Sequence, residues 1–261
     1  ANTTGAENAA LGYNSLTANT TGNRNVSVGD AALDASTTGS DNVAIGQQSL
    51  GSNTTASSNT AIGQKALFTN TTGHSNTAVG KEALLSNTTA LGNTAVGFVS
   101  MDANTTGNES AALGYNSLGA HTTGNSNVGV GFEGGAGITT GTNDTCVGRS
   151  SGATITTGTR STAIGSFSMG STNSKTGNSN TAMGYASLAK LSSGNNNTVI
   201  GDTAGGEITS GSGVTAIGIN AGGSVTTGSN HFFIGHGAGM ASGPGGTPGG
   251  AITTGNNEGV I

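Results

Sequence analysis

A glycine that recurs every 17 residues constrains the fold more than any other feature of this sequence. It follows an aliphatic residue or Met in 14 places, and successive copies lie 17 residues apart, apart from one step of 19 between Gly165 and Gly184. Such a fixed period is typical of solenoid proteins, in which each repeat packs only on its neighbours. We call these residues the anchor glycines: Gly12, Gly29, Gly46, Gly63, Gly80, Gly97, Gly114, Gly131, Gly148, Gly165, Gly184, Gly201, Gly218 and Gly235.

The three residues before each anchor glycine predict a short strand. The first is Thr in eight repeats and Val, Ala or Phe in the others, the second is a small residue, usually Ala, and the third is aliphatic or Met. Alternation places the first and third on one face and the small residue on the other. We predict that the third residues are buried as the structural core: Leu11, Val28, Ile45, Ile62, Val79, Val96, Leu113, Val130, Val147, Ile164, Met183, Ile200, Ile217 and Ile234.

A second apolar position lies four residues after the anchor glycine. It carries Leu or Met in nine repeats and Gly in five, and four of those five have Ile or Val three residues later, as in Ile138 and Ile155. In the fifth, Ile252 follows a Gly/Pro-rich insertion, and only the repeat with Leu188 and Leu191 has both side chains. This exchange predicts one pocket per repeat, filled from either side of a turn to keep the core volume constant.

Seventeen residues suit one coil of a parallel β-solenoid, with glycine providing positive φ at tight corners. We therefore expect an all-β parallel β-solenoid of about 14–15 rungs of 17 residues. Residues 1–261 should form a single repeat domain with insertions near 171–175 and 241–250. Because so thin a coil buries few large side chains, chains are expected to associate side by side. The repeat is cut off at Val260-Ile261, which suggests a piece of a longer fibre.

Charge and composition argue against several classes of function. Charged residues make up 7% of the chain and the net charge is −5, so there is no basic surface for nucleic acid. No apolar run approaches the ~20 residues of a membrane-spanning helix, so direct membrane insertion is not expected. Many charged residues come just after the anchor glycine or the Thr-Thr-Gly turn, where we expect side chains to face water. They are Lys65, Lys81, Glu82, Glu133, Arg149 and Asp202 after the glycine, and Glu7, Arg24, Asp41, Glu109 and Arg160 after the turn.

No group of residues suggests catalysis, a metal site or a cofactor, and we do not expect an enzyme. His74, His121, His231 and His236 belong to different repeats and are expected at solvated corners or strand starts. Cys146 occupies the small-residue position of its strand and is expected to be structural. The string Gly131–Gly137 lacks the Gly-Lys-Ser/Thr ending of a phosphate loop. The Asn-Thr-Thr triplets are formal glycosylation sequons, and we interpret them as turns.

Two segments carry a family resemblance: Asn42-Val43-Ala44-Ile45-Gly46-Gln47-Gln48-Ser49 and Asn76-Thr77-Ala78-Val79-Gly80-Lys81-Glu82-Ala83. They resemble the head repeats of the YadA-like trimeric autotransporter adhesins, although that family's coil is shorter. The longer form with Asn-Thr-Thr-Gly turns is similar to repeats in tail-fibre proteins of bacteriophages and giant viruses. The resemblance implies a left-handed β-roll, a homotrimer and an extracellular place on a cell surface or virion.

The expected function is that of a structural or adhesive fibre segment that presents variable corner residues to a host-cell or surface receptor. Two alternatives stay open: an ice-binding solenoid with ranks of Thr, and a purely structural extracellular filament. Against ice binding, the strand Thr rank is expected to share its face with the aliphatic core, and the two Thr of each turn face different ways. Neither the receptor nor the choice between bacterial surface and virion can be read from the repeats.

Overall fold

The structure, a computed structural model, describes residues 2–170, 174–239 and 259–260. These residues form a parallel β-solenoid of about 13 turns, with about 17 residues per turn and no helix. The chain divides into two compact units, Ala1–Asn127 and Val128–Ile261, which we call unit 1 and unit 2 and describe separately. The insertion near 241–250 and Ile252 lie outside the described residues.

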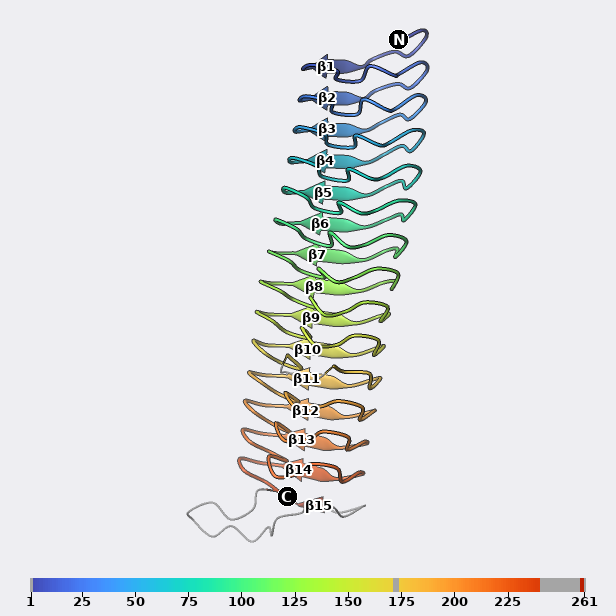
Figure 1. The fold of residues 1–261 in the computed structure, drawn as a ribbon. Helices are drawn as coiled ribbons and strands as arrows, with labels where there is room; N and C mark the ends of the chain where they lie inside the picture. The colour runs from blue at the N-terminus through green and yellow to red at the C-terminus, as the bar shows by residue number, and fades with distance from the viewer. Residues whose placement is uncertain (1, 171–173, 240–258, 261) are drawn as a thin grey trace. The chain divides into compact units, whose positions relative to one another are not determined.

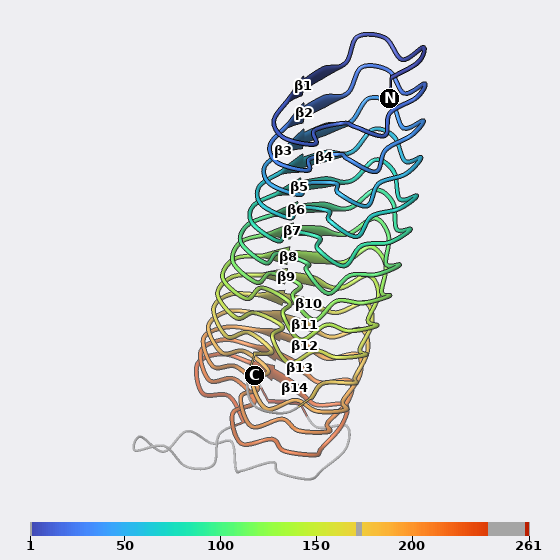
Figure 2. The same ribbon diagram turned by 45° about the horizontal axis from the view of Figure 1, so that its top comes forward.

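In each unit, three-residue strands follow one another at every turn, and the rest of the turn is loop (Figures 1 and 2). Unit 1 contains β1 Ala9–Leu11, β2 Val26–Val28, β3 Val43–Ile45, β4 Thr60–Ile62, β5 Thr77–Val79, β6 Thr94–Val96 and β7 Ala111–Leu113. Unit 2 contains β8 Val128–Val130, β9 Thr145–Val147, β10 Thr162–Ile164, β11 Thr181–Met183, β12 Thr198–Ile200, β13 Thr215–Ile217, β14 Phe232–Ile234 and β15 Gly259–Val260.

The strands pair in parallel in the register that the repeat predicts. Ile62 of β4 lies opposite Val79 of β5, and Ile164 of β10 opposite Met183 of β11, so the two extra residues of that turn do not shift the register. The loops are joined in the same way: the Thr37 N–H donates to the Thr54 carbonyl at 2.8 Å and the Gln48 N–H to the Asp30 carbonyl at 2.9 Å. Because these bonds run around the turn, each coil is held by its neighbours.

The prediction that the aliphatic rank forms the core of the coil is wrong for the single chain. Ile45 and Ile62 keep 38% and 37% of their surface exposed, and Leu113 keeps 52%. The residue between them faces inward instead, and from β2 to β14 it is buried, as at Ala44 and Ala61. The alternation was therefore read correctly, but its two faces were assigned the wrong way round. The coil is narrow at the strand, and a methyl group fills the space there.

Phe233 is the exception at this inward position, and the glycines around it explain how it fits. It is fully buried. A Cβ atom added to Gly239 would lie 2.5 Å from the Phe233 ring, and one added to Gly222 would lie 3.3 Å from it. Both residues stand at the position that is Leu or Met in most repeats. The ring therefore occupies space that a leucine side chain takes elsewhere.

The large side chains inside the coil come from the fourth and seventh positions after the anchor glycine. Leu84 and Leu118 in unit 1 and Ile138 and Ile155 in unit 2 are all buried. A Cβ atom added to Gly152 would lie 3.1 Å from Ile155 Cδ1, and one added to Gly205 would lie 3.0 Å from Ile208 Cδ1. The two positions thus point into the same space, as the exchange between them predicts.

Backbone geometry explains which residue type serves each position. The nine Leu and Met residues at the fourth position have φ between 48° and 54°, and the glycines there are also left-handed. Left-handed φ is especially unfavourable for β-branched residues, so Leu, Met and Gly occur at this position and Ile and Val do not. Among the described residues, none at the seventh position has a positive φ, and there Ile and Val are found.

The anchor glycines have φ from 116° to 141°, a region that only glycine adopts readily. Within each unit, all but the last anchor glycine also lie against the anchor glycine of the next turn. A Cβ atom added to Gly80 would lie 2.3 Å from the carbonyl oxygen of Gly97. The 17-residue glycine period therefore has two causes, the backbone conformation at this corner and the close stacking of successive turns.

Candidate interaction surfaces

The outward strand face presents a regular apolar surface in each unit. In unit 2, Met183, Ile200, Ile217 and Ile234 keep 36–39% of their surface exposed. Beside them runs a rank of Thr, at half-buried or exposed positions: Thr145, Thr162, Thr181, Thr198 and Thr215. Unit 1 carries the same face, with Thr60, Thr77 and Thr94 in its later strands. A regular apolar face of this kind is typical of surfaces that bind a partner.

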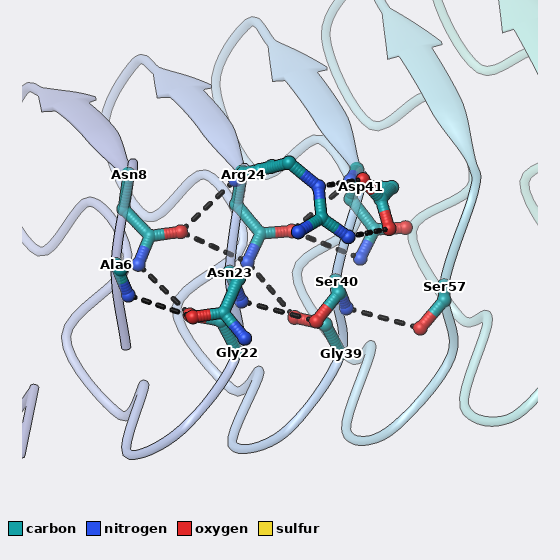
Figure 3. Close-up of polar contacts among 11 residues, drawn as sticks. Ala6, Asn8, Gly22, Asn23, Arg24, Gly39, Ser40, Asp41 and Ser57 are labelled. Carbon is teal, nitrogen blue, oxygen red and sulfur yellow. Dashed lines mark hydrogen bonds and ion pairs between the residues drawn. The ribbon is translucent and has the colours of Figure 1, made fainter. Parts of the chain in front are cut away.

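The corner after the Thr-Thr-Gly turn carries polar ladders (Figure 3). The Ala6 N–H donates to Asn23 Oδ1 at 2.8 Å, and the Ser40 N–H donates to Ser57 Oγ at 3.0 Å. Beside them, Arg24 binds Asp41 of the next turn through two contacts of 2.6 and 2.9 Å. The hydrogen bond from Arg24 lowers the pKa of Asp41. Both side chains are exposed, so this pair adds little stability.

The charged corner residues lie largely at the surface, as predicted. Lys81, Arg160 and Asp202 are exposed, while Glu82 is half-buried beside Lys81, 3.7 Å from its ammonium group. In the described part of the chain two charged residues are buried instead, and neither is among those predicted to lie at corners. They are Asp144 and Lys175, both fully shielded from solvent.

Asp144 replaces an asparagine in a buried amide ladder. At this position, Asn59 Oδ1 accepts the Asn76 N–H at 3.0 Å, and Asn76 Nδ2 donates to the Ala90 carbonyl at 2.8 Å. Asp144 Oδ1 likewise accepts the Ser161 N–H at 2.8 Å, but a carboxylate has no N–H to donate. Burial raises the pKa of Asp144 to about 7, and the hydrogen bond from Ser161 offsets part of that effect.

Lys175 belongs to the turn that carries two extra residues. Its Nζ donates to Thr154 Oγ1 at 2.9 Å and to the Ala189 carbonyl at 3.0 Å. Burial lowers the pKa of this lysine to about 8. The sequence signal was present, because this turn is the only irregular step between anchor glycines. What could not be seen is that the long side chain folds back into the coil.

Two of the four histidines are not at solvated corners, which corrects the prediction for them. His121 is buried in a second amide ladder, with Nδ1 3.0 Å from Asn104 Oδ1 and Nε2 3.1 Å from Asn127 Nδ2. Burial lowers its pKa to about 4, so the neutral ring takes the place of an amide. His231 is buried against Phe233, with ring centroids 5.5 Å apart. His74 and His236 are exposed.

The remaining candidates lie in structural positions. Cys146 is buried at the inward strand position, as predicted, and burial raises its pKa. The string Gly131–Gly137 forms a corner and the loop after β8, and no helix follows it among the described residues. Among the residues that the structure describes, no cluster of His, Cys, Asp and Glu could hold a metal ion. No membrane-spanning helix is found there either.

Apart from Asn2 in the first turn, the Asn-Thr-Thr turns bury their asparagines inside the coil. Asn87 Nδ2 donates to Asn70 Oδ1 at 2.8 Å, and Asn104 Nδ2 donates to Asn87 Oδ1 at 3.0 Å. These nitrogen atoms are inaccessible in the folded chain, which supports interpreting the triplets as turns. Successive asparagines at this position thus form a ladder of stacked amides along the coil.

Comparison with known proteins gives no relative for this chain. No family model matches it, and no curated protein or solved structure matches it significantly. The resemblance to YadA-like head repeats and tail-fibre repeats therefore depends on the repeat motif alone.

Proposed function

We propose that this chain is a segment of an extracellular homotrimeric fibre, an adhesin head or tail-fibre shaft on a cell surface or virion, without catalytic activity. The observation that carries the proposal is the outward strand face, where an aliphatic or Met residue recurs at every turn. Soluble proteins rarely expose an apolar strip of this length. A closed symmetric assembly covers such a strip on every copy, and it makes the side-by-side association that a thin coil needs.

The energetics favour burial of this face between chains. About a third of the residue surface is still exposed at Ile45, Ile62, Ile200 and Ile217, so covering such a residue returns about 0.5–1 kcal/mol per turn. Repeated over the turns of one unit, the gain reaches several kcal/mol per chain before the cost of association. The exposed corner residues stay outside such an assembly and are the surface that remains for a receptor.

Light scattering tests the assembly, with an expected mass three times the chain mass of 24.8 kDa. Ile200→Asp places a charge in the outward face and should dissociate the trimer. The matched control is Ser193→Asp, which adds the same charge at an exposed corner and should leave the mass unchanged. A wild-type chain that stays monomeric at all concentrations contradicts the proposal.

A second candidate, ice binding, is favoured by one observation. The Thr rank was expected to lie on the core face, and the structure places it outside, at five successive turns of unit 2. Threonine at regular spacing on a flat apolar face can order water. The two functions compete for one face, since a face buried in a trimer cannot meet ice. Thermal hysteresis by the wild-type chain, lost in Thr198→Leu, would support ice binding and count against the fibre.

A further inference from the structure

Aromatic side chains gather at one corner of the coil. The chain has 6 Phe, 3 Tyr and no Trp, and six of these nine occupy the first or second position after an anchor glycine. Other repeats carry Asp30, Gln47 or Gln64 at the first position, so the coil does not require a ring there. Exposed aromatic residues that the fold does not need indicate contact with a partner. The six are Tyr13, Phe98, Tyr115, Phe132, Phe167 and Tyr185.

In unit 2, four successive turns form what we call the aromatic–arginine column: Phe132, Arg149, Phe167 and Tyr185. The Arg149 guanidinium carbon lies 5.9 Å from the centre of the Phe132 ring and 5.4 Å from that of Phe167. Phe167 meets Tyr185 edge-on, with ring centroids 6.1 Å apart. Phe132 and Tyr185 keep 46% and 53% of their surface exposed. The column thus presents ring, cation and ring to solvent.

Arg149 is available to an anionic ligand. No carboxylate among the described residues forms an ion pair with it. The nearby acid Glu133 instead accepts a hydrogen bond from Ser150 Oγ at 3.3 Å. The two flanking rings hold the guanidinium, which reduces the entropy lost when its planar donors bind a carboxylate in two-point fashion. Asp202 is exposed at the turn after Tyr185 and limits the positive stretch to the column.

We propose that the aromatic–arginine column binds an acidic polysaccharide, with a sugar carboxylate on Arg149 and the apolar faces of neighbouring sugars on Phe132 and Tyr185. A pyranose ring has one face of C–H groups, which stacks on aromatic rings, and a uronic acid polymer repeats this face beside a carboxylate. The column repeats its aromatic rings along the stack of turns, with Arg149 among them, and so matches a linear polymer. The inference builds on the proposed fibre function by naming the class of receptor.

Unit 1 has a similar group of rings and a cation, which differs from the aromatic–arginine column in how it could bind a carboxylate. Lys81 lies 5.6 Å from the centre of the Phe98 ring, and Phe98 lies 5.8 Å from Tyr115, so a cation again stands beside exposed rings. That cation, however, is already paired with Glu82. A lysine also lacks the planar fork that binds a carboxylate at two points. The stronger site is therefore the column of unit 2.

Isothermal titration of the full chain with oligogalacturonate, and separately with a hyaluronan oligosaccharide, tests the proposal. Fully methyl-esterified oligogalacturonate keeps the sugar rings and removes the charge. We expect the acid form of at least one glycan to bind, the ester to bind more weakly, and Arg149→Gln to weaken binding about tenfold or more. Tyr185→Thr should weaken it as well. Arg160→Gln removes one exposed positive charge from another corner of the coil and should change affinity less than about twofold.

Three results would overturn the proposal. The first is no binding of either acidic glycan by the wild-type chain. The second is an equal loss of affinity in Arg149→Gln and Arg160→Gln, which would indicate general charge attraction. The third is a change of mass in Arg149→Gln or Tyr185→Thr without glycan, which would make the column a contact between copies. A trimeric rod that binds neither glycan refutes this inference and leaves the fibre proposal standing.

Discussion

The shared pocket inside the coil gives a sharp prediction about packing. Gly205 stands at the fourth position after its anchor and Ile208 at the seventh. A Cβ atom added to Gly205 would lie 3.0 Å from Ile208 Cδ1, 3.2 Å from Val199 Cγ1 and 3.3 Å from Leu188 Cδ2. The φ of Gly205 is 56°, close to that of the leucines at this position, so the backbone accepts Gly205→Leu. The penalty therefore comes from packing.

The expected losses of unfolding free energy follow from which side chains, at positions 205 and 208, fill the pocket. Gly205→Leu with Ile208 in place overpacks the pocket and should cost about 1–3 kcal/mol. Ile208→Ala leaves a cavity at a fully buried site and should cost about 2–5 kcal/mol. In the double variant the new leucine fills the space that isoleucine vacates. Its cost should therefore be smaller than the sum of the single costs by about 1–3 kcal/mol.

Equilibrium unfolding in guanidinium chloride at one protein concentration measures these differences, with the slope of the transition compared between variants because repeat arrays can unfold in parts. Gly206→Ala is the control, since a Cβ atom there meets only the Thr203 backbone, with the closest atom at 3.1 Å. Additive costs in the double variant would refute the shared pocket. Gly152 is a poorer test, because a Cβ atom there would lie 2.2 Å from Cys146 Sγ.

Three further predictions concern single positions. Leu84→Ile should cost about 1–3 kcal/mol because φ is 51° there, whereas Ile155→Leu should cost less than about 1.5 kcal/mol, and equal losses in unfolding experiments would contradict the backbone argument. Gly80→Ala should cost at least about 2 kcal/mol through strain and contact with the next turn, and an unchanged unfolding midpoint would count against close stacking. Burial raises the pKa of Asp144 to about 7, so between about pH 4 and 7 the folded chain holds a proton that the unfolded chain has lost. The free energy of unfolding should therefore fall as the pH rises through this range. Asp144→Asn should remove that fall and raise the free energy of unfolding by at most about 4 kcal/mol at pH 8, which unfolding at several pH values will check.

Much of the fold could be predicted from the sequence because the same residue pattern recurs in 14 repeats. The period fixed one turn per 17 residues, and the anchor glycines marked the corner that needs positive φ. The exchange between the fourth and seventh positions predicted a common pocket. Each of these depends on local backbone geometry or on volume, which a repeated sequence displays directly.

The candidate surfaces could be predicted only in part. Aromatic residues at the corner are visible in the sequence, but the placement of Arg149 between two rings depends on side-chain directions in successive turns. The burial of His121 and Asp144 was also hidden, since each occupies a position that carries a polar Asn or Ser in many other repeats. Only the structure shows that side chains at these positions point into the coil, where burying a charge costs free energy.

The sequence by itself determined the period, the strand register, the glycine corners and the alternation of the strand residues. It could not decide which strand face lies inside, because alternation is the same for either choice. The tertiary structure decided this by the width of the coil, which admits Ala61 and excludes Ile62 at the strand. The large interior side chains, such as Leu67, come instead from the loop, where the turn is wide enough to hold them. The aliphatic rank is consequently left on the surface, available to a partner.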